Sequence, residues 1–131
     1  MTYDDLTGYL YTTAVPVLLD GKVTAGRLAS EMHLRHDIRP HWFGRGFDIR
    51  LLLSALRHPL PSALSRMSDG VLLQILLDFA ATQSGILLLY PCSPEAEAFV
   101  GRNTEVLESR YVILHAPAVG DPLAPLVRCN R

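Results

Sequence analysis

The chain has 131 residues, of which 49% are apolar, and a formal net charge of −1 at pH 7. This length suits a single domain with its own core, and the apolar fraction excludes a disordered chain. A net charge near zero gives the whole molecule no bulk attraction to nucleic acid or to an anionic membrane.

The sequence also bears on the compartment. The two cysteines, Cys92 and Cys129, do not suggest a disulfide framework, which favours a reducing environment. Asp4 and Asp5 stand where a signal peptide would be basic, and the apolar runs fall far short of the about 18 residues that span a membrane. We therefore expect a cytoplasmic protein without a membrane partner.

The first half of the chain begins with a polar and aromatic arm, residues 1–13. A strand is expected at Val15–Leu19, followed by a break at Asp20-Gly21-Lys22 and a helix over Val23–His36. The helix has an apolar stripe on one face, whereas Arg27, Ser30, Glu31 and Arg35 lie on the other. A second strand is expected at Ile38–Phe43, leaving through Gly44-Arg45-Gly46.

The segment Asp48–Arg57 is ambiguous, although a stripe of leucines fits a helix with Asp48 as its N-cap. His58-Pro59-Leu60-Pro61 is expected to end this segment, because proline interrupts regular structure. A helix capped by Ser68 then covers Val71–Gln83, and Gly85 provides its stop.

The second half repeats the strand-loop-helix order. Ile86–Tyr90 is apolar throughout, as in a strand covered on both faces. Ser93 and Pro94 suit the start of a helix that runs to about Ser109. Its inward positions are expected to be Ala96, Phe99, Val100, Asn103, Val106 and Leu107. Tyr111–Leu114 is the last expected strand.

Alternating buried strands and helices predict a Rossmann-like three-layer α/β domain. We expect a mostly parallel sheet of four or five strands with helices on both faces, and the segments around Val17, Trp42 and Leu88 running in the same direction. The domain is expected to cover 14–116, and 117–131 to be a tail or linker.

Three stretches give the chain a family resemblance: Asp20-Gly21, Phe43-Gly44-Arg45-Gly46 and Pro91-Cys92-Ser93-Pro94-Glu95. In order and spacing they resemble the N-terminal domain that precedes the ATP-grasp domain in uncharacterised bacterial carboxylate-amine ligases and carbamoyl-phosphate-synthase-like proteins. The resemblance covers roughly residues 14–127.

The resemblance implies a substrate-side domain that is not catalytic by itself. Such relatives join a carboxylate to an amine through an acyl phosphate formed with ATP. It also implies that ATP and Mg²⁺ belong to a downstream ATP-grasp domain, so no cofactor is expected in this chain. A stand-alone module that binds a small molecule or a partner, and a dinucleotide-binding Rossmann domain, remain as alternatives.

The candidate substrate-binding residues follow the expected strands: Asp20, Gly21 and Lys22 after the first, Gly44 and Arg45 after the second, and Cys92, Ser93 and Glu95 after the third long one. Loops that leave parallel strands are where such sheets bind ligands. The pattern around Gly21 lacks both the G-x-G-x-x-G and the phosphate-loop signatures. We expect no catalytic residue, since Cys92 has no identifiable base partner.

Residues 33–66 hold six arginines and four of the five histidines. Nucleic-acid binding, with Trp42 and Phe43 stacking on bases, is weaker here than a solvated basic face. His33 and His36 stand at a spacing that could hold a metal, but no cysteine lies nearby, and we expect none to bind. A wide apolar stripe on the helix 71–83 leaves a homodimer open.

Overall fold

The computed structural model describes residues 14–123. In chain order its elements are β1 (Ala14–Leu19), α2 (Lys22–His36), β2 (His41–Gly44), α3 (Ile49–Ser54), β3 (Leu56–Pro59), the 3₁₀ turn η1 (Leu64–Arg66), α4 (Asp69–Ala81), β4 (Ile86–Pro91), α5 (Pro94–Arg102), α6 (Thr104–Glu108) and β5 (Val112–Ile113). The expected N-terminal arm, 1–13, and the end of the expected tail, 124–131, lie outside the described residues.

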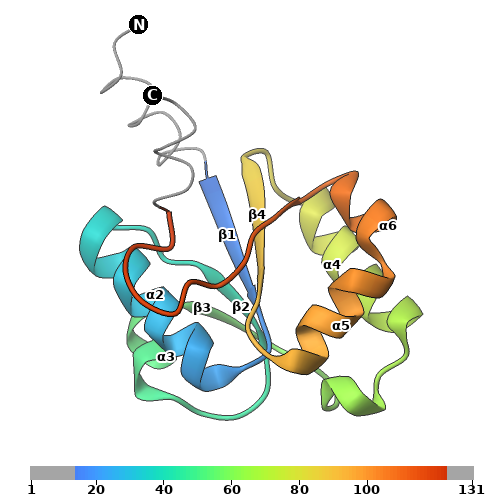
Figure 1. Ribbon diagram of the computed structural model, residues 1–131, viewed down its shortest axis with the longest axis horizontal. Coiled ribbons are helices and arrows are strands. Elements are labelled where there is room, and N and C mark those ends of the chain that lie inside the picture. The colour runs from blue at the N-terminus through green and yellow to red at the C-terminus, as the bar shows by residue number, and fades with distance from the viewer. Residues whose placement is uncertain (1–13, 124–131) are drawn as a thin grey trace, which may run out of the picture.

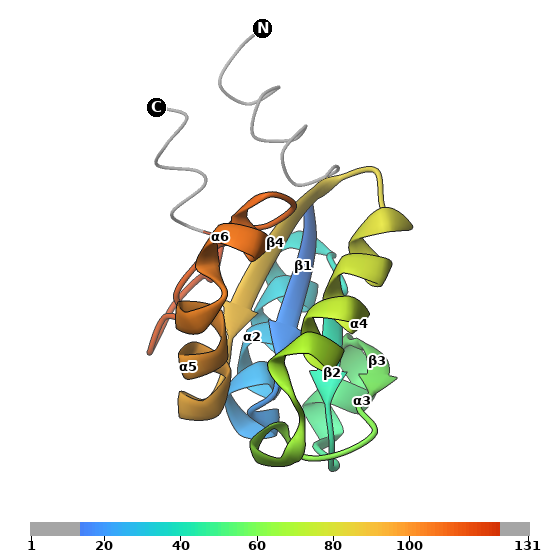
Figure 2. The same cartoon turned by 90° about the vertical axis from the view of Figure 1, so that its right-hand side faces the viewer.

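The strands form one parallel sheet in the order β3-β2-β1-β4-β5. Helices α2 and α3 cover one face, and α4, α5 and α6 cover the other (Figures 1 and 2). This confirms the predicted three-layer α/β class, and the segments around Val17, Trp42 and Leu88 run in the same direction as expected. None of the helices within residues 14–123 combines the length and the apolar character that crossing a membrane requires.

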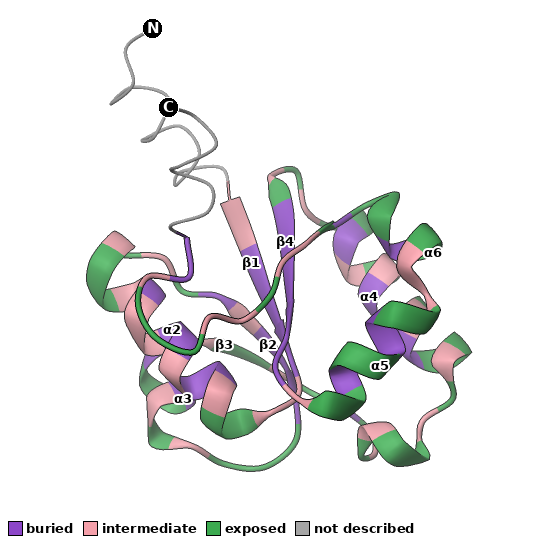
Figure 3. Cartoon of the chain, in the orientation of Figure 1, coloured by how far each residue is buried: buried purple, intermediate pink, exposed green. Residues whose placement is uncertain are grey.

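Successive side chains of the central strands point to opposite faces of the sheet. They therefore build two cores, one on each face. Val17 and Leu19 of β1 face α4 and α5, while Leu18 faces α2. Strand β4 does the same, since Leu89 joins the first core and Tyr90 the second. Figure 3 shows the result: β1 and β4 are buried along most of their length, and the outer faces of the helices are exposed.

The stretch after β5 packs on the face covered by α2 rather than leaving the domain. Leu123 is fully buried, and the hydroxyl of Tyr90 donates to the carbonyl of Pro122 at 2.8 Å. The guanidinium of Arg27 donates to the carbonyl of Pro117. In Figure 1 this stretch crosses the sheet toward α2. The described part of the expected linker, 117–123, is therefore part of the domain.

Strand β3 includes His58 and Pro59 and ends at Pro59, within the stretch His58-Pro59-Leu60-Pro61 that was expected to end regular structure. The amides of Leu56 and Leu60 donate to carbonyls of Pro40 and Gly44, so alternate nitrogens of β3 face β2. The nitrogen of Pro59 faces away from β2 and needs no partner there. Proline is accepted at such an edge, and it also removes a donor that another strand could pair with. The ambiguous segment 48–57 divides into α3 and the start of this strand.

Two further boundaries differ from expectation. The strand expected at Ile38–Phe43 begins at His41, because Asp37 ends α2 with a left-handed φ of 54° and Arg39-Pro40 lead into the strand. The helix expected to continue to about Ser109 breaks at Asn103, whose side chain bonds Asp69 and the carbonyl of Phe99. The break turns α6, so Val106, expected to face inward, is 44% exposed.

Candidate functional site

The strands β1, β2 and β4 end side by side at one edge of the sheet, called here the carboxyl edge. Leu19 pairs with Phe43 on one side and with Pro91 on the other. The chain builds outward from β1 through β2 to β3, then returns to β4, so the strand order reverses next to β1. Ligands of open parallel sheets bind at the carboxyl edge, at such a reversal.

The exit from β1 is a tight turn of two left-handed residues. Asp20 has φ 61° and Gly21 has φ 54°, a conformation that costs least for glycine and is tolerated by aspartate. The amide of Asp20 donates to the carbonyl of Phe43 at 2.7 Å, and the indole of Trp42 donates to the Asp20 carbonyl at 3.0 Å. Strand β2 thus fixes the turn from one side.

Strand β4 fixes the same turn from the other side. The hydroxyl of Ser93 donates to Asp20 Oδ2 at 2.6 Å and accepts from the amide of Ala96 at 3.1 Å, capping α5. A Cβ at Gly21 would lie 1.9 Å from the Cys92 carbonyl oxygen, so the two loops touch through their backbones. Four predicted residues, Asp20, Gly21, Cys92 and Ser93, are therefore in mutual contact.

Cys92 is part of this contact through its backbone rather than its thiol. Its amide donates to the carbonyl of Leu19 at 2.9 Å, and its side chain is buried. Burial, with the Asp20 charge as a smaller cause, raises the pKa of the Cys92 thiol to about 12. The thiolate that a nucleophile or metal ligand needs is strongly disfavoured there.

The predicted residues after β2 form a neighbouring hollow of about 220 Å³. Gly44 lies against the indole of Trp42, since a Cβ there would come within 2.5 Å of the ring. Arg45 is exposed and donates to the carbonyl of Pro61 at 3.3 Å. The side chain of Lys22 lies over Gly46, whose φ is 101°. Lys22 and Arg45 therefore bring two cations to the carboxyl edge.

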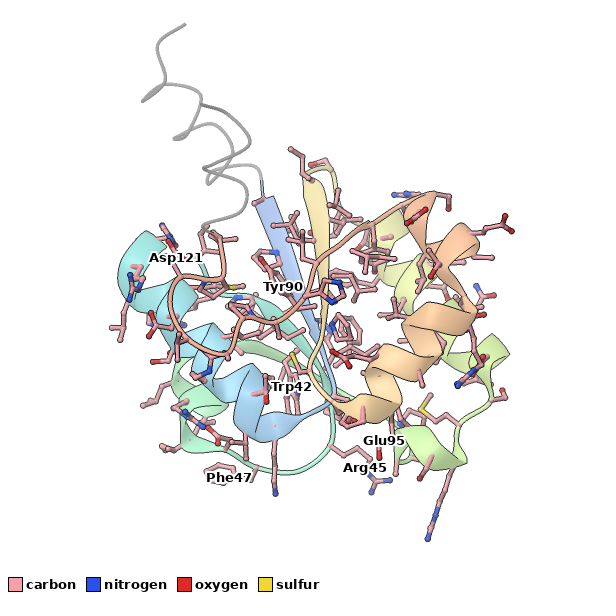
Figure 4. The ribbon with its side chains drawn as sticks, viewed as in Figure 1. Trp42, Arg45, Phe47, Tyr90, Glu95 and Asp121 are labelled. Carbon is pink, nitrogen blue, oxygen red and sulfur yellow. The ribbon has the colours of Figure 1, made fainter. Side chains whose placement is uncertain are left out.

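Glu95 does not join the other predicted residues. It lines a separate hollow of about 240 Å³ between α5 and the start of α4, together with Asp69 and Arg102. Figure 4 shows Glu95 and Arg45 at the end of the molecule where β1 and β4 finish, with Trp42 directed inward. Glu95 is exposed in the first turn of α5, where an acidic side chain interacts favourably with the helix dipole.

A groove lies between α2 and α5, and two of the predicted residues, Cys92 and Ser93, line it. It has a volume of about 330 Å³ and is open to solvent. Its walls are Thr24, Arg27, Glu97, the turn 91–94 and residues 116–118. Arg27 and Glu97 contribute opposite charges from the two helices. Helical spacing could place Arg27 on the outer face of its helix, but only the fold brings 116–118 over it.

His33 and His36, the two histidines at metal-like spacing, have different partners. His33 Nδ1 lies 3.1 Å from Ser54 Oγ, and His36 Nε2 lies 2.8 Å from both carboxylate oxygens of Asp121. These two histidines therefore do not converge on one point. Within residues 14–123 no cluster of three or more histidine, cysteine, aspartate or glutamate side chains could hold a metal ion.

Comparison of the chain with protein-family models, with curated proteins and with solved structures finds no match in any of the three. The fold and the contacts at the carboxyl edge therefore define the class, a Rossmann-like α/β domain.

Proposed function

We propose that this chain is the N-terminal, substrate-side domain of an ATP-grasp-type ligase that joins a carboxylate to an amine. The observation that carries the proposal is the convergence of the three stretches that give the resemblance. The turns after Leu19, Phe43 and Pro91 lie at the same carboxyl edge, because Leu19 pairs with Phe43 on one side and with Pro91 on the other.

The groove between α2 and α5 supports a small polar ligand. A volume of about 330 Å³ is at the lower end for ligand pockets. Arg27 offers a cation that can pair with a carboxylate, and Glu97 an anion that can pair with an amine. Because the groove is open, a second domain lying against it would complete the enclosure. We place the binding of the acid or amine here.

ATP and Mg²⁺ are assigned to the domain that would follow. The turn between β1 and α2 has two residues, too short for a glycine-rich phosphate loop. At the start of α2, where a dinucleotide-binding sheet holds its pyrophosphate, the carboxylate of Asp20 lies in contact with Ser93. This favours the ligase domain over the dinucleotide alternative.

An exposed apolar surface supports a neighbouring domain or a second copy of the chain. Its residues come from α3 and its flanks: Phe47, Ile49, Leu52, Leu53 and Leu56, each between 45% and 63% exposed. Adjacent exposed apolar side chains of this kind commonly mark an interaction surface. We take a cytoplasmic location with the free Cys92 thiol as part of the same proposal.

The gene provides the first test. An ATP-grasp domain encoded in frame after Arg131 is the expected result, and a stop codon there would favour the stand-alone module. The second test is enzymatic: ADP release with Mg²⁺, ATP and a panel of acids and amines. We expect release from the joined protein and none from the 131-residue chain, so Mg-dependent turnover by the chain alone would contradict the proposal.

A further inference from the structure

The hollow beside the exit of β2 brings positively charged side chains together. It has a volume of about 220 Å³ and is lined by Trp42, the turn 44–46, Arg57 and residues 59–60. Arg57 of the edge strand β3 pairs with Trp42 of β2, so both side chains lie on the same face of the sheet. Among the described residues 14–123, no aspartate or glutamate belongs to this lining. The hollow therefore favours an anion.

The cations around the hollow are not neutralised by the part of the chain that the structure describes. Arg45 donates to the carbonyl of Pro61 at 3.3 Å but forms no ion pair with a described residue. The side chain of Arg57 forms neither a hydrogen bond nor an ion pair there. Lys22 is the third cation, since a Cβ at Gly46 would lie 3.4 Å from Lys22 Nζ. These side chains are available to pair with a ligand.

The backbone of the same turn adds further donors. Pairing between β2 and β3 ends where the amide of Leu60 donates to the carbonyl of Gly44 at 3.1 Å. Beyond that point, the amides of Arg45 and Gly46 donate to no acceptor within residues 14–123. Gly46 has a φ of 101° and carries no side chain, so a ligand can approach the backbone closely. Guanidinium groups and backbone amides are the donors that proteins use to hold oxyanions.

We propose that Arg45, Arg57 and Lys22 bind the phosphate group of a small molecule in this hollow. Three cations favour a dianion over a singly charged carboxylate, and the guanidinium fork matches the geometry of phosphate oxygens. A volume of about 220 Å³ lies below the about 300 Å³ at which small-molecule pockets begin, so it suits one phosphate group rather than a whole nucleotide. The hollow shares no lining residue with the groove between α2 and α5, so phosphate binding does not depend on the proposed ligase function.

Trp42 provides the probe for the test, because it lines the hollow and is the single tryptophan of the chain. Its fluorescence is followed while inorganic phosphate, methyl phosphate or acetate is added at constant ionic strength, which keeps the screening equal. We expect both phosphates to saturate one site and acetate to bind at least about tenfold more weakly, because it carries less charge. Binding of inorganic phosphate alone would identify the free ion as the ligand. Phosphate binding no tighter than that of acetate would overturn the proposal.

Matched variants separate this hollow from general attraction to a basic surface. Arg45→Gln and Arg57→Gln should each weaken phosphate binding at least about tenfold, because each removes a charged donor. Arg66→Gln removes the same charge from η1, outside the hollow, and should bind as the parent does. The amide spectrum reports whether each variant is folded, and in the parent chain phosphate should shift the amides of 44–47 and 57–60. Equal affinity in all three variants, or shifts confined to other residues of the parent, would contradict a phosphate site here.

Discussion

Ser93 Oγ donates to Asp20 Oδ2 across the carboxyl edge at 2.6 Å, joining residues 73 positions apart in the chain. The same hydroxyl caps α5 through the amide of Ala96. One side chain therefore connects the exit of β1 with the exit of β4 and begins the helix that walls the groove. The shape of the candidate site depends on this contact.

Replacing Ser93 by alanine removes the cap and the bond to Asp20 together. We expect the Ser93→Ala variant to lose about 2 kcal/mol of unfolding free energy, since a lost cap costs about 1 kcal/mol and the unpaired Asp20 carboxylate adds to it. Ser68→Ala is the matched control, because Ser68 caps α4 through Val71 alone. Urea unfolding measures both, and equal losses would mean that the bond to Asp20 contributes nothing.

Gly21 should tolerate no side chain. The positive φ and the 1.9 Å approach of a Cβ to the Cys92 carbonyl oxygen combine strain with a backbone clash. We expect Gly21→Ala to lose more than about 3 kcal/mol. Gly101 of α5 has nothing within 4 Å, so Gly101→Ala should gain about 0.5–1 kcal/mol. Thermal unfolding of the two variants measures both changes in stability. A Gly21→Ala variant as stable as the parent would refute the described contact between Gly21 and Cys92.

The Cys92 thiol should not react in the folded chain. Its pKa is raised to about 12 by burial, so almost no thiolate forms at about pH 8. In a Cys129→Ser background, iodoacetamide should label Cys92 only after urea unfolding. Labelling of the folded chain at the rate of a free thiol would show that Cys92 is accessible at the carboxyl edge.

Acid should weaken the contact between α4 and the end of α5. Hydrogen bonds from Arg102 and Asn103 lower the pKa of the Asp69 carboxyl to about 2. A carboxyl with a lowered folded pKa stabilises above its unfolded pKa, about 3.9, and this contribution is lost as the pH falls toward about 2. A ¹³C titration of Asp69 should give a midpoint near 2, and Asp69→Asn should flatten the stability profile below about pH 4. A midpoint near the unfolded value of about 3.9 would mean that the three side chains do not interact.

The sequence predicted the central layers because hydrophobic patterning decides them. The run Ile86–Tyr90 has no polar interruption, which is typical of a strand covered on both faces, and β4 has that form. Strand β3 was missed because its evidence is not in its own residues: Leu56 and Arg57 are exposed, and Pro59 normally argues against a strand. This segment is a strand because it pairs with β2, and that pairing depends on the fold rather than on the residues of β3.

Part of the candidate site could be predicted because hydrophobic patterning locates the buried strands and therefore the loops that follow them. Loops that follow buried strands had to reach one edge, so Asp20 and Ser93 could be named from the sequence. The direction of Glu95 depends on the rotation of α5. Arg27 and Glu97 belong to the site only because residues 116–118 form one wall of the groove. A proline-rich stretch such as 117–123 carries no periodicity that would predict its place on the α2 face.

The most direct measurement is an amide NMR titration of the ¹⁵N-labelled chain with small carboxylic acids and amines. We predict that the ligand that binds shifts residues 20–27, 91–97 and 116–118, and that Arg27→Ala abolishes the shifts while Arg110→Ala does not. Shifts confined to other parts of the chain, or shifts that persist in Arg27→Ala, would contradict a substrate site at the carboxyl edge.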